Sequence, residues 1–290
     1  MEAFLMQVTS GIASGAIYAS LALALVIIFQ STHNINFAQG EMATFSAYLG
    51  WFALDRGVPY WVAFSALIIV SFFMGVFVQW VFVRPVKKKS PLANVIVFIG
   101  LMLIFNGLSG WLFGHTLKEF PSPFSPEYFP GSKYFSSHQL GSIMVVLIIM
   151  ALLFLFLRFT KTGLAMRAGA TNPSSARLVG ISVSIMLAFG WGLAAAIGAI
   201  AGVLIAPSVY LEPNMMFGVL IYGFAGALVG GISNPWGAVA GGIIVGVLEN
   251  VLGAYVIGTD MKLTLALCLI VAVLTVKPEG LFGKTIASRV

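Results

Sequence analysis

Long apolar segments separated by short polar breaks run through almost the whole chain. They fall at residues 5–29, 37–54, 61–83, 92–114, 139–158, 184–206, 216–232, 236–257 and 262–276. Because these segments are too long and too evenly apolar for the strands of a membrane barrel, they indicate helices. The pattern predicts an all-α, polytopic integral membrane protein with about eight or nine transmembrane helices of about 20 residues each. The short segments 37–54, 216–232 and 262–276 indicate that some of these helices are half-length, tilted or broken.

The composition supports this fold class. The chain is 60% hydrophobic and only 8% charged, whereas a soluble domain carries about 25% charged residues. Its 32 glycines indicate many closely packed helices, because small residues let membrane helices approach one another. The single cysteine, Cys268, lies in an apolar segment, so there is no disulfide framework and no metal-ligand spacing. We therefore expect residues 1–290 to form one transmembrane domain.

The basic residues indicate the orientation of the chain. Three breaks hold four, four and three of the 15 lysines and arginines, which makes 11: Arg84 and Lys87 to Lys89; Arg158, Lys161, Arg167 and Arg177; Lys277, Lys284 and Arg289. Positive charges favour the cytoplasmic side of a membrane protein, so we place all three breaks there. Residues 84–91 then form a cytoplasmic basic loop and the C-terminus is cytoplasmic. Because the basic residues cluster beside apolar segments, they do not indicate a protein that binds nucleic acid, despite the net charge of +6.

This topology places residues 115–138 outside the membrane, as an extracytoplasmic loop. The loop is rich in proline and aromatic residues: Pro121, Pro123, Pro126 and Pro130, with Phe120, Phe124, Tyr128, Phe129, Tyr134 and Phe135. Proline prevents a regular helix, and aromatic side chains suit a membrane interface. The segment is either an ordinary surface loop or a docking surface for an external partner.

The sequence contains no catalytic constellation. Its three histidines, His33, His115 and His138, lie in separate breaks, and there is no metal-binding or nucleophile motif. We therefore predict no catalytic residue and no bound metal, so the chain is not an enzyme. It also lacks the full Gly-x-x-x-x-Gly-Lys-Ser/Thr motif of a phosphate loop, so any ATP that drives it must be hydrolysed by a partner.

Two acids lie in or beside apolar segments. Glu41 follows the polar break 31–40, and Glu249 lies near the end of the segment 236–257. A carboxylate is costly in lipid and should face a polar interior, a partner or the interface. Each acid either belongs to a translocation path or gate, or terminates or pairs a helix.

The break 31–40 is unusually polar, and a second break, 230–237, contains Asn234 and Pro235. Asn and Gly tolerate bent backbone, and broken helices in transporters line water-filled routes. Pro235 suits the first turn of the next helix. Each break is either such a broken helix or a tight turn. The candidate pathway residues are Asn34, Asn36, Phe37, Gln39, Gly40, Glu41, Asn234, Pro235 and Glu249.

Glycines recur at helical spacing around the second break: Gly223, Gly226 and Gly230 before it, and Gly237, Gly241, Gly242 and Gly246 after it. Most of each set fall on one helix face. This spacing favours close helix packing, and the alternative is a backbone surface that the substrate approaches.

Residues 161–180, here called the polar island, are basic, rich in small residues and poorly suited to a bilayer. Asn172 can cap a short helix that starts at Pro173 and continues through Leu178. Such a helix, flanked by Arg167 and Arg177, could occupy a groove of a cytosolic protein. The alternative is an ordinary cytoplasmic loop.

The chain resembles, over essentially its whole length, the permease subunits of the high-affinity branched-chain amino acid ABC importers, of the shorter H type. The order and spacing of several motifs carry this resemblance: Ile35–Glu41; Arg84–Val86; Gly163, Arg167–Ala168, Asn172, Ala176 and Gly180–Ile181; Gly230–Gly231, Pro235, Gly237–Ala238 and Gly241–Gly242; and Pro278 with Gly280–Gly283.

The resemblance implies a transport complex in a bacterial inner membrane. Two permease subunits, a heterodimer rather than a homodimer, form the pore by alternating access. Two cytosolic ABC ATPases with ATP and Mg bind below it, and an extracytoplasmic binding protein delivers substrate. Residues 159–182 would be the cytoplasmic coupling segment, with the ATPase-coupling residues Gly163, Arg167, Ala168, Asn172, Ala176, Arg177 and Gly180. Unlike many importers, the segment has no Glu before Ala168.

Alternatives remain for both substrate and class. Related systems carry urea, short amides or other amino acids, so the resemblance does not identify the solute. A stand-alone channel or secondary carrier would instead depend on Glu41 or Glu249 to select solute or couple ions.

Overall fold

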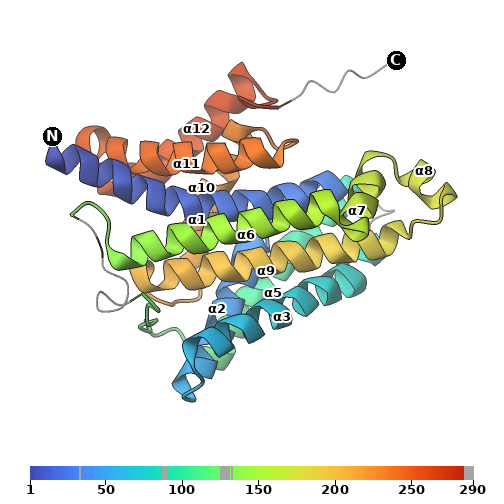
Figure 1. Cartoon of the computed structure of the whole chain (residues 1–290), viewed down its shortest axis with the longest axis horizontal. Helices are drawn as coiled ribbons and strands as arrows, with labels where there is room; N and C mark the ends of the chain where they lie inside the picture. Colours follow the sequence, from blue (N-terminus) through green and yellow to red (C-terminus); the bar gives the residue numbers. More distant parts are fainter. Residues whose placement is uncertain (33, 87–89, 125–130, 132, 284–290) are drawn as a thin grey trace. The chain divides into compact units, whose positions relative to one another are not determined.

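The computed structural model describes residues 1–32, 34–86, 90–124, 131 and 133–283. Within these ranges the regular structure is helical (Figure 1), and the one isolated antiparallel bridge joins Lys118 to Leu211. In the described part of the chain, seven helices are long and apolar enough to cross a membrane. The predicted all-α, polytopic membrane fold is therefore confirmed.

Each predicted apolar segment corresponds to one helix. The helices are α1 (Glu2–Thr32), α2 (Gln39–Asp55), α3 (Tyr60–Val78), α5 (Pro91–Phe113), α6 (Ser137–Phe159), α9 (Val183–Val209), α10 (Met215–Gly230), α11 (Pro235–Leu252) and α12 (Lys262–Val276). Helix α3 continues through the π-helix Gln79–Val83 and α4 (Arg84–Val86), and α11 continues through the π-helix Gly253–Ile257. A 3-10 turn, Thr259–Met261, precedes α12. All three predicted short segments form short helices, namely α2 of 17, α10 of 16 and α12 of 15 residues.

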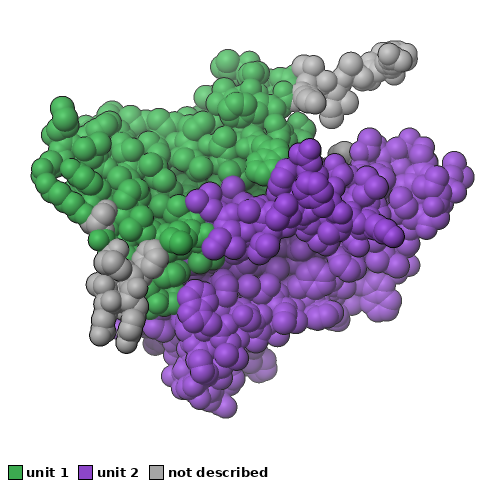
Figure 2. Space-filling view, in the orientation of Figure 1, with its two compact units in different colours: residues 1–26, 122–146, 218–290 green, residues 27–121, 147–217 purple. Residues whose placement is uncertain are grey.

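The chain forms two compact units, shown in Figure 2. Unit 1 consists of residues 1–26, 122–146 and 218–290, and unit 2 of residues 27–121 and 147–217. Helices α1, α6 and α10 each contribute residues to both units.

Glycines set the packing inside unit 1. A Cβ atom added at Gly242 of α11 would lie 2.5 Å from the Cα of Ala19 in α1, and one at Gly226 of α10 would lie 2.6 Å from the Cα of Gly242. Both distances are shorter than real carbon contacts, so the three backbones are as close as glycine allows. The glycine spacing therefore serves close helix packing, as predicted.

The segment after α12 satisfies the end of α10, also within unit 1. The backbone N–H of Leu281 donates to the carbonyl of Val229 at 2.8 Å, and that of Phe282 donates to Gly230 at 3.1 Å. The last carbonyls of a helix have no partner inside it, so the C-terminal segment supplies the missing donors. Gly280 permits the turn, with a φ of +77°.

Helix α9 is the centre of unit 2, and α2 lies along it. The Gln39 side chain, at the start of α2, donates from Nε2 to the carbonyl of Ala194 at 2.8 Å. About two turns further along α9, a Cβ at Gly202 would lie 2.7 Å from the carbonyl oxygen of Ala43. Because both pairings advance in the same direction, α2 runs parallel to α9.

The contact between Gln39 and Ala194 also fixes the depth of α2. Ala194 lies eleven residues after the start of α9 at Val183, which corresponds to about 16 Å at 1.5 Å per residue. The hydrocarbon core of a bilayer is about 30 Å thick. Helix α2 therefore begins near the middle of the α9 span, as a half-helix does.

We expect Gly242→Ala to destabilise the protein by about 1–3 kcal/mol, because the added methyl group meets the backbone of α1. Thermal unfolding of the purified protein in detergent measures the loss. The matched control is Gly107→Ala on α5, where an added Cβ has no atom within 4 Å. Equal melting temperatures for the two variants would show that the glycine contact does not limit packing.

Candidate functional site

The polar island forms two short helices between α6 and α9, namely α7 (Lys161–Thr171) and α8 (Pro173–Leu178) (Figure 1). Thr160 caps α7, since its Oγ1 accepts the N–H of Gly163 at 3.0 Å. A Cβ at Gly163 would lie 2.6 Å from the Cα of Leu157. Only glycine therefore lets α7 turn so tightly against the end of α6.

Asn172 separates the two short helices. Its Oδ1 accepts the backbone N–H groups of Ser174 at 3.1 Å and of Ser175 at 3.0 Å. Pro173 is the first residue of α8, where its missing N–H leaves nothing unsatisfied. The predicted cap and the short helix 173–178 are both confirmed.

One residue attaches α8 to the membrane-spanning α9. Ala176 is 4% exposed and packs with Val183 and Leu187 of α9, and with the partly buried Ile181. Between these elements the chain turns at Gly180, which has a φ of +83°. Ala176 therefore joins α8 to the first turns of α9 by direct packing.

The remaining surface of the polar island is open. Arg167 and Arg177 are exposed, and neither side chain has a hydrogen bond or ion pair to any described residue. Leu178 is 89% exposed and Val179 75% exposed. Ala168 is half-buried. The segment thus combines unpaired positive charge with exposed apolar side chains, which suits a protein partner.

The first break belongs to unit 2, and most of its candidate residues are buried there. Asn36 is fully buried, accepts the N–H of Ala38 at 3.1 Å and donates to Gln39 Oε1 at 3.3 Å. Gly40 is also buried. These bonds replace those that a continuous helix would make, so the break is a true interruption. Phe37 is 38% exposed.

Among the described residues, Asn34 bonds only to the nearby Thr32: its Nδ2 donates to the carbonyl of Thr32 at 2.8 Å, and its backbone N–H donates to Thr32 Oγ1 at 3.3 Å. His33 lies outside the described residues.

Glu41, in the first turn of α2, belongs to a polar cluster that the sequence did not predict. The carboxylate is 4% exposed and accepts the Nδ2 of Asn106, on α5, at 3.2 Å. The same Nδ2 lies 3.2 Å from the carbonyl of Pro213 and 2.9 Å from Oδ1 of Asn214. Asn106 was missed because a lone Asn in an apolar segment gives no pattern.

Glu249, in unit 1, is a paired acid. It accepts the hydroxyl of Tyr18 at 2.8 Å and forms an ion pair with Lys262 at 3.3 Å. Tyr18 also stacks on Tyr222 at 5.0 Å between ring centroids. The helix-pairing role weighed for Glu249 is therefore present, joining α11 to α1 and α12, whereas a pathway role stays a prediction.

Asn234 and Pro235 start α11. Asn234 Oδ1 accepts the N–H of Trp236 at 3.1 Å, and its Nδ2 donates to the carbonyl of Phe282 at 3.0 Å. Pro235 is the first helical residue, as predicted. Because Glu249 lies near the other end of α11, the structure does not bring these candidate residues together.

The predicted loop 115–138 ends two residues earlier than expected, since α6 begins at Ser137. Ser136 accepts the N–H of Gln139 at 3.2 Å, and Gln139 accepts the N–H of Ser136 at 2.9 Å. This reciprocal pair is a capping box, a sequence signal that the hydropathy pattern did not reveal. Pro126, Tyr128, Phe129 and Pro130 lie outside the described residues.

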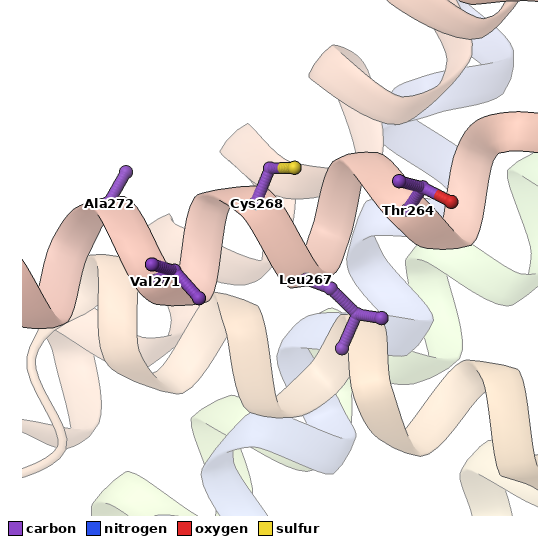
Figure 3. A pocket seen from close by; sticks show the side chains of 5 residues that line it. All are labelled: Thr264, Leu267, Cys268, Val271 and Ala272. Carbon is purple, nitrogen blue, oxygen red and sulfur yellow. The ribbon is translucent and has the colours of Figure 1, made fainter.

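The exposed face of α12 carries a shallow apolar groove (Figure 3). It is lined by Thr264, Leu267, Cys268, Val271 and Ala272, all on one helix. It offers no charged group, so it suits the acyl chains of lipid better than a polar solute. No group of three or more metal-binding side chains occurs in the described part of the chain.

Comparison with protein families matches residues 7–274 to the family described as branched-chain amino acid transport system, permease component. The permease protein LivH of the high-affinity branched-chain amino acid transport system of Salmonella typhimurium is 28% identical, covering 99% of this chain and 98% of its own. BraD of Pseudomonas aeruginosa, from a system of the same description, is also 28% identical over the same shares.

Among solved structures, PsaBC from Streptococcus pneumoniae in complex with Fab aligns with a TM-score of 0.50 and 11% identity. The alignment covers 93% of this chain and 91% of that chain. At this identity the likeness concerns the fold alone.

Asn172→Ala should loosen α8 by about 1 kcal/mol, because the N-terminal amides of the helix lose their cap. Hydrogen exchange of the peptide 173–178 should then be about fivefold faster. Asn172→Asp retains an acceptor oxygen and should exchange like the wild type. Unchanged exchange in the alanine variant would mean that packing of Ala176, rather than the cap, holds the helix.

Lys262→Met should destabilise the protein by about 3 kcal/mol, since it leaves the Glu249 carboxylate buried without a cation. The double variant Glu249→Gln with Lys262→Met removes both charges and should lose clearly less. Unfolding in detergent measures both. Additive losses in a cycle of single and double variants would contradict a direct interaction.

Proposed function

Because the chain belongs to the family of branched-chain amino acid transport permease components, we propose that it is the transmembrane permease subunit of an ATP-driven importer. The proposed substrates are branched-chain or related hydrophobic amino acids, and the proposed location is a bacterial inner membrane. The observation that carries the ATP-driven role is the exposed basic surface of α7 and α8, combined with the absence of any phosphate loop in the sequence.

The coupling step follows from the attachment of these helices. An ATPase bound to Arg167 and Arg177 would push α7 and α8 as it closes on ATP and Mg. The packed Ala176 would pass that movement to Val183 and Leu187, at the start of α9. Within unit 2, α9 carries α2 through Gln39 and the close contact at Gly202. The half-helix therefore moves with the coupling segment, as alternating access requires.

The proposal implies further partners. A second permease subunit would complete the pore as a heterodimer, two cytosolic ABC ATPases would bind the polar island and its counterpart, and an extracytoplasmic binding protein would deliver the solute. Lys118 and Leu211, joined by backbone bonds of 3.1 and 2.9 Å, lie in the loops that would face that protein. Urea, short amides or other amino acids are the alternative substrates.

A stand-alone secondary carrier is the second candidate function. One observation favours it, namely that Glu41 is buried without a cation among the described residues. Such a carboxylate is what an ion-coupled carrier uses. Transport by the chain without any ATPase would distinguish this class.

Reversing both charges of the polar island tests the coupling role. Arg167→Glu with Arg177→Glu should reduce co-purification of the ATPases and ATP-dependent uptake by about tenfold or more, because like charges at an interface are strongly unfavourable. The matched control is Arg56→Glu. Arg56 is another exposed arginine, and its guanidinium carbon lies 4.4 Å from the centroid of the Phe52 ring. Unchanged assembly and uptake in the double variant would exclude the docking role.

A further inference from the structure

Glu41 lies near mid-depth of the proposed membrane span, where burying a charge costs the most free energy. Helix α2 begins near the middle of the α9 span, and Glu41 stands in its first turn with 4% of its surface exposed. A charged side chain at that depth requires a partner or a polar cavity. The start of a helix offers partial positive charge to it, but no full compensating charge.

Glu249 and Glu41 differ in the cations and hydrogen-bond donors that lie beside their carboxyl groups. Glu249 has both a cation, Lys262 at 3.3 Å, and a hydroxyl donor, Tyr18 at 2.8 Å. Glu41 has one neutral donor, the Asn106 amide at 3.2 Å, and no ion pair among the described residues. Glu249 is therefore paired with a cation inside the protein, whereas the Glu41 carboxyl has no cation beside it among the described residues.

The cluster around Glu41 also has too few donors. The Nδ2 of Asn106 faces three acceptors: the Glu41 carboxylate, the Pro213 carbonyl at 3.2 Å and the Asn214 Oδ1 at 2.9 Å. A side-chain amide nitrogen carries two hydrogens, so one acceptor is left over at any moment. A cluster that holds a carboxyl group and a surplus of acceptors suits a cation that brings several N–H donors.

Access and surroundings fit a small solute. Asn214 is exposed, so the cluster is open on that side. Phe45, one turn after Glu41 on the same face of α2, pairs with Phe105 at 5.6 Å between ring centroids. Phe105 precedes Asn106 on α5. An apolar wall thus stands beside the oxygen cluster.

We propose that Glu41, Asn106 and Asn214 form a transient binding site for the α-ammonium group of the translocated amino acid. The ammonium supplies three N–H donors and one positive charge, which are what the cluster lacks, and the apolar side chain of the solute lies against Phe45 and Phe105. This inference rests on the proposed function and deepens it, because it assigns substrate chemistry to residues of the permease itself.

The test uses the full complex in proteoliposomes, with binding protein loaded with L-leucine at saturating concentration. Glu41→Gln should lower the maximum rate of leucine uptake by about tenfold or more, because hydrogen bonds to a charged group are lost. ATP hydrolysis stimulated by the loaded binding protein should stay within about twofold, as for a change that leaves docking intact. Glu41→Asp should recover part of the uptake.

The control is Glu2→Gln, the same chemical change at an exposed carboxylate paired with Lys133 on the surface. It should leave uptake unchanged. Normal uptake in Glu41→Gln, together with ATP-dependent uptake in the wild type, would overturn the ammonium site and leave the proposed function standing. Absence of ATP-dependent uptake in the wild type would instead refute the proposed function.

A second variant keeps the test decisive if Glu41→Gln does not assemble. Asn214→Lys changes an exposed residue and offers the cluster an ammonium group of its own. It should raise the melting temperature of the complex and abolish uptake. Higher stability with normal uptake would overturn the proposal.

A sodium site is the remaining alternative, and wild-type thermal stability separates it from the proposal. The proposal predicts that 3-methylbutylamine raises the melting temperature of wild-type complex but not of Glu41→Gln. Stabilisation by sodium chloride relative to choline chloride, with no effect of the amine, would contradict it.

Discussion

The bilayer provides no water for unsatisfied polar groups, so each one inside it must find its partner within the protein. This constraint explains the interrupted chain before α2. Asn36 supplies an acceptor to Ala38, and Gln39 reaches the Ala194 carbonyl of α9, so a helix can begin near mid-depth. The end of α10 follows the same rule, because Leu281 and Phe282 donate to its last carbonyls.

The same constraint decides what is rigid and what is available for function. Hydrophobic attraction between helices is weak in lipid, so close backbone contact has to hold them together. The glycines of α1, α10 and α11 provide it in unit 1, and Gly202 provides it between α9 and α2 in unit 2. Under the proposed function, a displacement of α8 would reach α9 and the start of α2 through these contacts. The Glu41 carboxyl, in contrast, has no cation beside it among the described residues.

The parts of this architecture that depend on local chemistry could be predicted from the sequence. Apolar length predicts the helices, since the bilayer imposes that length, and Asn172-Pro173 predicts the start of α8. Contacts between distant residues could not be predicted. Asn106 lies 65 residues from Glu41, and Tyr18 lies 231 residues from Glu249. Each looks unremarkable in its own apolar segment, and only the packing of helices gives it a role. Hydropathy also indicated that α2 is short, but its depth follows only from the contact with α9.

The proposed function requires that energy from ATP enters this chain through partner subunits. The most direct measurement is uptake of radiolabelled L-leucine by proteoliposomes that contain the permease subunits and binding protein, with and without the ATPases. The account predicts accumulation only when the ATPases and internal ATP are present, and otherwise no uptake above that of empty liposomes. Equal uptake without the ATPases would contradict it and identify the chain as a channel or secondary carrier.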